Sequence, residues 1–444
     1  MTEAPKNGRP PVIEFDATFV VRGNRNVMRI SALTTFVIAI LFASNAAAQV
    51  IALTHATLID GTGAPAQDDI TIVTENGRIR DIGPSRSTTM PANATVLDLT
   101  GKFVVPGIIN AHGHVGPAPR DPQLRQYALY GVTTTTSMAA DPEDIVEFKA
   151  RQQAGELRGA RILTVRYRFT TLRGNGDDYK TPEAARRKVD DIATKGADFI
   201  KVWIDAQGGR QPKLKRDFVA AVLDQARRHG KLTMAHVVEL EDARMVVDEG
   251  VNLIMHNVRD QDIPADFIAT LKTKNIAVTS TLAREEGMLS AGGGAPDNPF
   301  FRNGLTPQQS ATLAHKLTGL TADPERQALT RSFEQDKRNV KRLLDGGVRL
   351  GFGTDSGGAS ERFFVQGYYE HRQMELMIQT GFTPMLVIQS FSKINSEMLG
   401  IDKDFGTLAK GKAADLLVLT KNPLDDIVNM RTLDAVYLGG RKFE

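Results

Sequence analysis

The alternation of apolar and polar residues divides the chain into two strand-rich ends and a middle of mixed pattern. After Gln49, the segments "VIALTHATLIDGTG", "ITIVTENGRIRDIG" and "ATVLDLTGKFVVPG" alternate with period two and end in Gly, Asn or Asp, as short strands do. The same texture returns near the C-terminus in "GTLAKGKAADLLVLTKN" and "TLDAVYLGGRKF". We therefore expect residues 49–105 and 402–444 to meet in one small β-sandwich.

Between these ends, over residues 106–401, apolar runs typical of strands alternate with helical stretches. The eight strand candidates are "VVPGIINAHGH", "GVTTTTSMAA", "ARILTVRYRF", "ADFIKVWIDA", "KLTMAHVV", "VNLIMHNV", "IAVTSTLA" and "VRLGFGTDS". The predicted helices cover residues 182–196, 215–229, 239–249, 264–274, 331–346 and 361–380. This alternation predicts an α/β fold with a (β/α)8 TIM-like barrel, in which functional groups gather at the C-terminal strand ends. Residues 284–330 are rich in Gly, Pro and polar residues, and we expect them to form a lid or insert.

Composition narrows the class of protein. The chain has 444 residues, of which 41% are hydrophobic and 24% charged, as in an ordinary soluble globular protein. A formal net charge of +3, with no basic stripe, argues against a nucleic-acid partner. Cysteine is absent, which excludes disulfides, thiolate metal ligands and a cysteine nucleophile.

A secretory signal is predicted before the first strand. Arg29, the apolar stretch Ile30–Ala43 and the small residues Ala46–Ala48 follow the order of a signal peptide. The apolar run is shorter than the ~20 residues that a membrane span needs, which disfavours an anchor. We expect residues 1–48 to be a leader and signal peptide, whether translation begins at the first methionine or at Met28. The mature chain would then be secreted or periplasmic, with no stable membrane span.

Two histidines stand one residue apart at the end of the first predicted barrel strand, in "NAHGHVG". His112 and His114 are at positions i and i+2, so both side chains point the same way from a strand. Gly113 between them lets the backbone bend. Such a pair can chelate one metal ion from a rigid strand end.

Four further polar residues lie on other barrel strands. In "ADFIKVWIDA", Lys201 alternates with aliphatic neighbours and is expected to face the barrel interior. A buried unpaired ammonium costs several kcal/mol, so this lysine needs a partner or a change such as carboxylation by carbon dioxide. His236 and His256 end the fifth and sixth strands, and Asp355 ends the eighth. Nitrogen and oxygen donors of this kind suit zinc or a similar ion.

Each of these residues has an ordinary structural explanation when taken alone. A single strand histidine is usually a packed core residue, a barrel lysine can be ion-paired, and "TDSGG" around Asp355 is good turn chemistry. Their joint occurrence at five predicted strand ends favours a metal site.

At this point the sequence resembles the amidohydrolase superfamily over nearly all of the mature chain. The resemblance rests on "ATLIDGTG", "VVPGIINAHGH", "GTDS" and "GTLAKGKAADLLVL". The segments "ADFIKVWIDAQGG" and "AHVVELEDA" are similar to the imidazolonepropionase-like and Xaa-Pro-dipeptidase-like branch. One departure is Gly113, where the superfamily often has Thr or Cys, and this position is not a ligand.

The resemblance implies a site with two divalent metal ions, with zinc as the expected metal. His112, His114 and Asp355 would hold the more buried ion, and His236 and His256 the more exposed one. An N6-carboxylated Lys201 and a hydroxide would bridge the two ions. Asp355 would act as general base and then general acid in hydrolysis of an amide-type C–N bond.

Two other classes of function stay open. His236 and Glu239 have the His-x-x-Glu spacing of mononuclear deaminases, although neither a deaminase nor an imidazolonepropionase-type ring hydrolase needs Lys201. A non-catalytic scaffold of the same fold is a further alternative, since fold does not fix function. Two, one or no metal ions per chain would distinguish the hydrolase, the deaminase and the scaffold.

The substrate is less defined by the sequence than the metal site. The expected partner is a small-molecule amide, such as a dipeptide, an N-acyl amino acid or a cyclic amide, and a homo-oligomer stays open. The segment "RYRFT" lacks a histidine that some relatives have there. An arginine could bind a substrate carboxylate, and an aromatic side chain could line the pocket. The substrate-binding candidates are Arg166, Tyr167, Arg168, Trp203 and Arg259, with Arg284 as a further arginine.

Overall fold

The computed structural model describes most of the chain after the predicted signal peptide. The described residues are 50–116, 119–139, 141–171, 181–206, 208–209, 211–290, 298–302, 305–311, 324–358 and 365–444. They belong to one unit, Ala48–Glu444, and the predicted leader and signal peptide lie outside them. Among the described helices, none combines the length and the apolar character that a membrane crossing needs.

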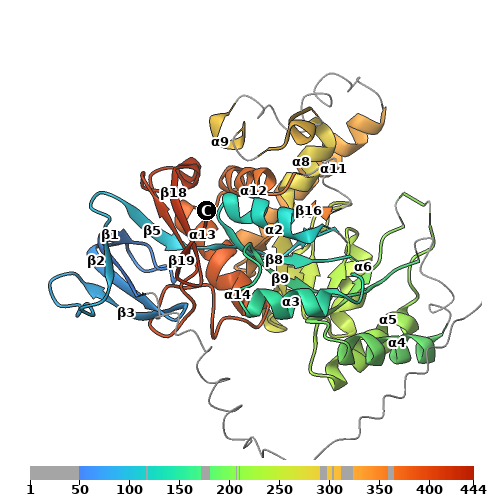
Figure 1. Cartoon of the computed structure of the whole chain (residues 1–444). Coiled ribbons are helices and arrows are strands. Elements are labelled where there is room, and N and C mark those ends of the chain that lie inside the picture. The colour runs from blue at the N-terminus through green and yellow to red at the C-terminus, as the bar shows by residue number, and fades with distance from the viewer. Residues whose placement is uncertain are drawn as a thin grey trace, which may run out of the picture. The chain divides into compact units, whose positions relative to one another are not determined.

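The two strand-rich ends of the chain meet in one mixed sheet of eight strands (Figure 1). Their order is β19-β18-β17-β5-β1-β2-β3, with β4 paired to β1. The central strand β5 pairs antiparallel with C-terminal β17 and parallel with N-terminal β1. The meeting of the two ends agrees with the sequence, whereas the two-layered sandwich and the domain boundaries stay predictions. The strands are β1 (Ile51–Leu58), β2 (Gln67–Glu75), β3 (Arg78–Pro84), β4 (Thr95–Asp98), β5 (Phe103–Pro106), β17 (Leu416–Leu419), β18 (Leu433–Leu438) and β19 (Arg441–Lys442).

The middle of the chain forms parallel strands in arcs, and no closed barrel sheet is found among the described residues. One arc has the order β6-β8-β9, a second runs from β10 to β15 in order, and β16 pairs with β7. Backbone hydrogen bonds connect the arcs, among them those from Asp198 N to Thr164 O (2.8 Å) and from Ala111 N to Phe352 O (3.1 Å). The strands are β6 (Ile108–Asn110), β7 (Gly113–His114), β8 (Val132–Ser137), β9 (Arg161–Thr164), β10 (Arg168–Phe169), β11 (Phe199–Trp203), β12 (Leu232–His236), β13 (Leu253–Met255), β14 (Ala277–Ser280), β15 (Leu350–Phe352) and β16 (Ser356–Gly357).

The third predicted strand is broken in two. Arg166 has a φ of 55°, in the left-handed region, and it lies between β9 and β10. A non-glycine residue in that conformation cannot continue a strand. The sequence pattern alone predicted one continuous strand there, because it carries no signal for this backbone turn.

All six predicted helices are present, with shifts at their ends. Helix α11 begins at Pro324 rather than at 331, and α12 begins at Tyr368 rather than at 361, directly after Gly367 with a φ of 87°. Within 284–330, the predicted lid or insert, the described residues include parts of helices α8, α9 and α11, and its role as a lid stays a prediction. The helices are α2 (Arg120–Leu129), α3 (Ile145–Gln153), α4 (Pro182–Thr194), α5 (Arg216–Arg228), α6 (Leu240–Asp248), α7 (Ala265–Thr273), α8 (Leu282–Ser290), α9 (Pro299–Arg302), α11 (Pro324–Asp345), α12 (Tyr368–Gln379), α13 (Pro384–Gln389), η3 (Ser390–Ile394), α14 (Asn395–Met398) and η4 (Ile427–Arg431).

The two faces of β11 pack as the sequence predicts. Ile200 and Val202 belong to the hydrophobic cluster that includes residues of helices α4 and α5. Phe199 belongs to a different cluster, which includes Met234 and Met255 and lies on the inner face of the strands, away from α4 and α5. Because side chains alternate along a strand, Lys201 shares the inner face with Phe199.

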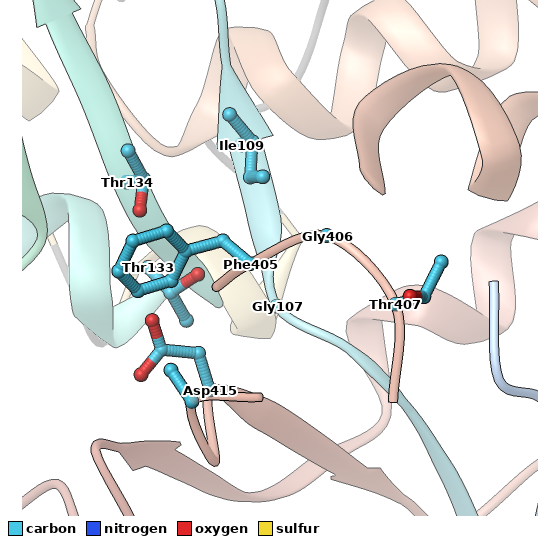
Figure 2. A pocket seen from close by; sticks show the side chains of 9 residues that line it. Gly107, Ile109, Thr133, Thr134, Phe405, Gly406, Thr407 and Asp415 are labelled. Carbon is cyan, nitrogen blue, oxygen red and sulfur yellow. The ribbon is translucent and has the colours of Figure 1, made fainter. Parts of the chain in front are cut away.

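A small cavity lies at the amino-terminal ends of β6 and β8, whereas His112 follows the carboxyl-terminal end of β6. Gly107 and Thr133, which line it, lie at the starts of β6 and β8 (Figure 2). Its volume of about 10 Å³ is room for one water molecule. Arg161 closes one side, with its guanidinium 3.9 Å from the Phe405 ring and 2.9 Å from Asp415 Oδ2. This cavity is therefore structural and is separate from the candidate site.

Candidate metal centre

The six candidate ligands lie along the carboxyl-terminal parts of five parallel strands. His112 and His114 follow β6, Lys201 lies within β11, and His236 is the last residue of β12. His256 comes directly after β13, and Asp355 is the third residue after β15. The register of the six-stranded arc places Trp203 opposite His236 and His236 opposite Met255, so the strand ends are level.

The structure brings all six side chains together. Asp355 Oδ1 lies 2.6 Å from His114 Nε2 and 3.5 Å from His112 Nε2, and Asp355 Oδ2 lies 4.0 Å from His256 Nε2. Lys201 Nζ is 3.0 Å from His112 Nε2. The His256 ring lies between two others, 4.4 Å from that of His112 and 4.2 Å from that of His236. Donor atoms of His112, His256 and Asp355 lie within 4.8 Å of one another.

Unusual backbone conformations aim two of these side chains. His256 has a φ of 79° and Asp355 a φ of 56°. Left-handed backbone at a non-glycine residue is costly and concentrates at functional sites. At Gly353, an added Cβ would stand 2.7 Å from His112 Cβ, so only glycine lets these strand ends approach so closely. Asp355 N then donates to His112 O over 2.7 Å.

His256 is oriented as metal-binding histidines are. Its Nδ1 lies 2.7 Å from Thr281 Oγ1 at the end of β14. Its Nε2 is buried, points toward Asp355 and has no hydrogen-bond partner among the described residues. A histidine that ligates a metal usually engages its second ring nitrogen with a neighbouring polar group, which fixes the ring. The free Nε2 therefore fits a ligand atom.

Burial sets the protonation state of the imidazoles. Desolvation, with the positive charge of Lys201 as a further cause, lowers the pKa of His112 well below its usual value, and desolvation does the same for His256. For His236, desolvation lowers the pKa to about 3. His112, His236 and His256 are thus neutral at physiological pH, as metal binding requires.

The pKa values of Lys201 and Asp355 are both lowered. Desolvation lowers the pKa of Lys201 from 10.5 to about 7, although Asp355 opposes this shift. Burial alone would raise the pKa of Asp355, but His112 and His114 hold it well below the usual range. Near pH 7 the site then offers a carboxylate and a partly neutral amine.

A buried network behind the site holds Asp355 and the first histidine pair in register. The Glu370 carboxylate, on α12, accepts hydrogen bonds from Asn110 (2.6 Å), Thr354 (2.8 Å) and Ser356 (2.7 Å). Asn110 lies two residues before His112, and Thr354 and Ser356 flank Asp355. The sequence did not reveal Glu370, since a single glutamate in a helical stretch gives no signal of burial.

The substrate-binding candidates fall into separate places. Arg168 stacks over Trp203 at 4.2 Å, and the Trp203 ring lies 4.8 Å from that of His236, so this pair reaches the cluster. Tyr167 contacts Lys188 of α4, whose Nζ lies 4.6 Å from the centre of the tyrosine ring. Arg166 is buried, and its carbonyl accepts from Asp141 N over 2.9 Å.

A charged chain runs from the far side of the site to Asp355. Arg259 Nη1 lies 3.3 Å from Glu285 Oε1, which Arg284 Nη1 contacts at 2.5 Å. Arg284 Nε lies 2.7 Å from Asp355 Oδ2. The sequence analysis did not identify Glu285 as part of the site. Its position directly after the candidate Arg284 could have indicated an acidic partner for that arginine. Asp205, also missed, lies 3.5 Å from His236 Nε2, two residues beyond the end of β11.

The metal-free protein is expected to become more stable as the pH rises from about 7 toward 10.5. In that window the unfolded Lys201, with its usual pKa of 10.5, binds more protons than the folded one, whose pKa is about 7. Stability therefore increases with pH, by at most about 1.4 kcal/mol per pH unit for one group. Urea unfolding with chelator in buffers free of carbon dioxide measures this slope. A Lys201→Met chain should have a smaller slope, and equal slopes would contradict the buried, depressed amine.

Among curated proteins, similarity is partial. An uncharacterised protein of Mycobacterium bovis is 26% identical over 262 residues, which cover 54% of this chain. The match spans 65% of that relative, less than two thirds of its length. A dihydroorotase of Trichlorobacter lovleyi is 42% identical over 57 residues, 13% of this chain and 12% of that protein.

Solved structures match over far more of the chain. A prolidase candidate from Bifidobacterium longum is 27% identical with a TM-score of 0.75, covering 89% of this chain and 94% of that one. A Xaa-Pro dipeptidase with bound methionine (20% identical, TM-score 0.71) and molinate hydrolase (22%, TM-score 0.70) each cover 89% of this chain. The match covers 100% of that dipeptidase and 95% of molinate hydrolase. At these identities the last two show the fold alone, which is the amidohydrolase fold of TIM-barrel type.

The family model described as "Amidohydrolase family" matches residues 103–442. That stretch contains all six candidate ligands and the C-terminal strands of the eight-stranded sheet. The resemblance predicted from the sequence is confirmed, and with it the expectation of a hydrolase acting on C–N bonds is supported. The chain belongs to the amidohydrolase family.

Proposed function

We propose that this protein is a metal-dependent hydrolase that cleaves an amide-type C–N bond in a small molecule. The observation that carries the proposal is the convergence of four imidazoles, one buried lysine and one carboxylate at level strand ends. Dipeptides, N-acyl amino acids and cyclic amides are the proposed substrates. The names of the structural relatives, a prolidase, a Xaa-Pro dipeptidase and molinate hydrolase, support this range.

The residues present fit two divalent ions, and we propose zinc. Members of this family generally bind divalent metals. The buried Nε2 of His256 has no hydrogen-bond partner among the described residues, so its lone pair could bind a metal ion. His112, His114 and Asp355 would hold one ion, and His236 and His256 the other. Imidazole and carboxylate donors suit zinc.

Lys201 would join the two halves of this site as a carbamate. The neutral amine attacks the carbon of carbon dioxide, which forms an N–C bond and releases one proton from nitrogen. The pKa of about 7 supplies the neutral amine at physiological pH. The resulting anion has two oxygens and no longer carries the positive charge that desolvation penalises in this buried side chain. Carbon nuclear magnetic resonance after exposure to isotopically labelled bicarbonate tests this modification.

When bound, divalent ions supply Lewis acidity that activates water and polarises a carbonyl at neutral pH. Asp355 supplies the proton transfers. Its low pKa keeps it ionised, so it can accept a proton from the attacking water and return it to the leaving nitrogen. The stacked pair Arg168 and Trp203 lies beside His236 and would form one wall of the substrate pocket.

The deaminase alternative loses support from the position of Glu239. Its carboxylate pairs with Lys213 at 2.7 Å, and 39% of its side chain is exposed. It is the residue before α6, as expected for a carboxylate at a helix N-terminus. A proton donor for a substrate ring should instead face the buried cluster.

The proposal also covers the architecture of the chain and its export from the cell. We infer that the parallel arcs form one (β/α)8 barrel over residues 106–401, and that the sheet strands of 49–105 and 402–444 form a β-sandwich beside it. We also infer export, on the signal-like order of residues before Gln49. Cell fractionation and N-terminal sequencing of the mature chain test the export, with a mature N-terminus at Gln49 expected.

A substrate screen tests the proposed reaction. The zinc-loaded protein is incubated with dipeptides, N-acyl amino acids, lactams and carbamates, and release of the amine is followed. We expect hydrolysis of at least one of these classes and loss of that activity on chelation. Release of ammonia from an amino-substituted ring, with no cleavage of any amide, would favour the deaminase.

A further inference from the structure

Arg284 contacts two carboxylates, and the proposed chemistry would take one of them away. It lies in the first turn of α8, directly after β14, whose two neighbours lead to His256 and Asp355. Its Nε contacts Asp355 Oδ2 at 2.7 Å, and its Nη1 contacts Glu285. If Asp355 holds a divalent ion, the Nε edge of the guanidinium loses this carboxylate.

Among the residues that the structure describes, the charges around Arg284 would then leave one positive charge in excess. Arg259 and Arg284 share the single carboxylate of Glu285, whose pKa is low because the two guanidiniums overcome its burial. The other nearby acid, Asp336, is fully buried, and burial together with Glu285 raises its pKa well above the usual range. Asp336 therefore contributes little negative charge. Two partly buried guanidiniums that share one carboxylate are costly, so a further anion beside Arg284 would stabilise the metal-bound state.

We propose that Arg284 binds the carboxylate of the substrate. This inference rests on the proposed function and narrows it to amides with a free carboxylate next to the scissile bond, namely dipeptides and N-acyl amino acids. The planar guanidinium matches a two-oxygen anion, and one excess positive charge matches a monoanion. Because Arg284 reaches Asp355, a carboxylate bound to it lies close to the reacting carbonyl. Arg259, which lines a groove beside α11, acts one step away by pairing with the buried Glu285.

Binding of molecules that have no scissile bond tests the anchor independently of catalysis. L-methionine and L-methioninol, and likewise L-proline and L-prolinol, differ only at the carboxylate. By calorimetry with the zinc-loaded full chain, we expect the acid of at least one pair to bind about tenfold more tightly than its alcohol. Arg284→Gln should abolish that preference, while the matched variant Arg372→Gln should keep it. Arg372, on α12, pairs at 2.6 Å with Glu286 of α8, the helix that carries Arg284, and none of its ion pairs among the described residues is with Asp355.

Kinetics provide the second readout. On dipeptides or N-acyl amino acids, Arg284→Gln should lower kcat/KM by about 100-fold, mainly through KM, and on the C-terminal carboxamides it should change little. Equal loss on acids and carboxamides, or no acid preference in any binding pair, would overturn the anchor. A protein that hydrolyses none of these amides yet shows the Arg284-dependent acid preference would refute the proposed function and leave the anchor standing. Hydrolysis that is insensitive to Arg284 would do the reverse.

Discussion

Replacing Asp355 with asparagine is expected to lower the hydrolytic kcat/KM by about 10⁴-fold, the upper range for loss of a general acid–base group. The carboxamide keeps the size of the side chain but cannot accept and return a proton. It also removes the negative charge that His112, His114 and Arg284 surround at distances of 3.5, 2.6 and 2.7 Å. Steady-state kinetics with the zinc-loaded protein measure the change.

The matched control is Asp242→Asn. Asp242, on helix α6, is also a buried carboxylate, but its partner is Lys213, at 2.8 Å. We expect this variant to keep near wild-type activity, and both variants to retain the circular dichroism of the parent. Substantial activity of the Asp355→Asn protein would show that Asp355 has no role in proton transfer.

Replacing Lys201 with alanine is expected to reduce hydrolysis by about 10³-fold and to weaken metal binding by at least about 10-fold. Lys201 is 2% exposed and lies 3.0 Å from His112 Nε2, so its removal takes the proposed bridging group out of the buried cluster. The fold should survive, because removal of a buried amine with a depressed pKa also removes an unfavourable desolvation.

Two companion measurements separate the bridge from packing. Lys201→Met restores the buried volume without the amine, and it should be as inactive as the alanine variant. Added short-chain carboxylates, which fill the space with two oxygens, should restore part of the activity of Lys201→Ala but none of the activity of Lys201→Met. An active Lys201→Met protein would contradict the carbamate bridge.

The sequence predicted the positions of the site well because they follow from periodicity. Alternation along "ADFIKVWIDA" placed Lys201 on the inner face, and the structure separates Ile200 and Phe199 into outer and inner clusters accordingly. The strand-end rule then brought His236 and His256 to one level. Local patterns of this kind depend on only a few neighbouring residues, so they can be seen in a single sequence.

Other features depend on contacts between distant segments and had no local signal. Glu370 meets Asn110 across 260 positions, and Arg284 meets Asp355 across the segment that was predicted to be a lid or insert. The left-handed backbone of Arg166 and His256 also escaped prediction, because non-glycine residues adopt that conformation only rarely. What was missed is therefore mostly the surroundings that orient the ligands.

The metal content of the purified protein tests the central claim most directly. The full chain is stripped with chelator, titrated with zinc in bicarbonate buffer, and analysed for bound metal and for amide hydrolysis in the same samples. We predict that activity rises with zinc and reaches its maximum at two ions per chain, and that Lys201→Met fails to reach this stoichiometry. Full activity at one ion per chain, or hydrolysis that does not respond to metal, would contradict the two-ion site.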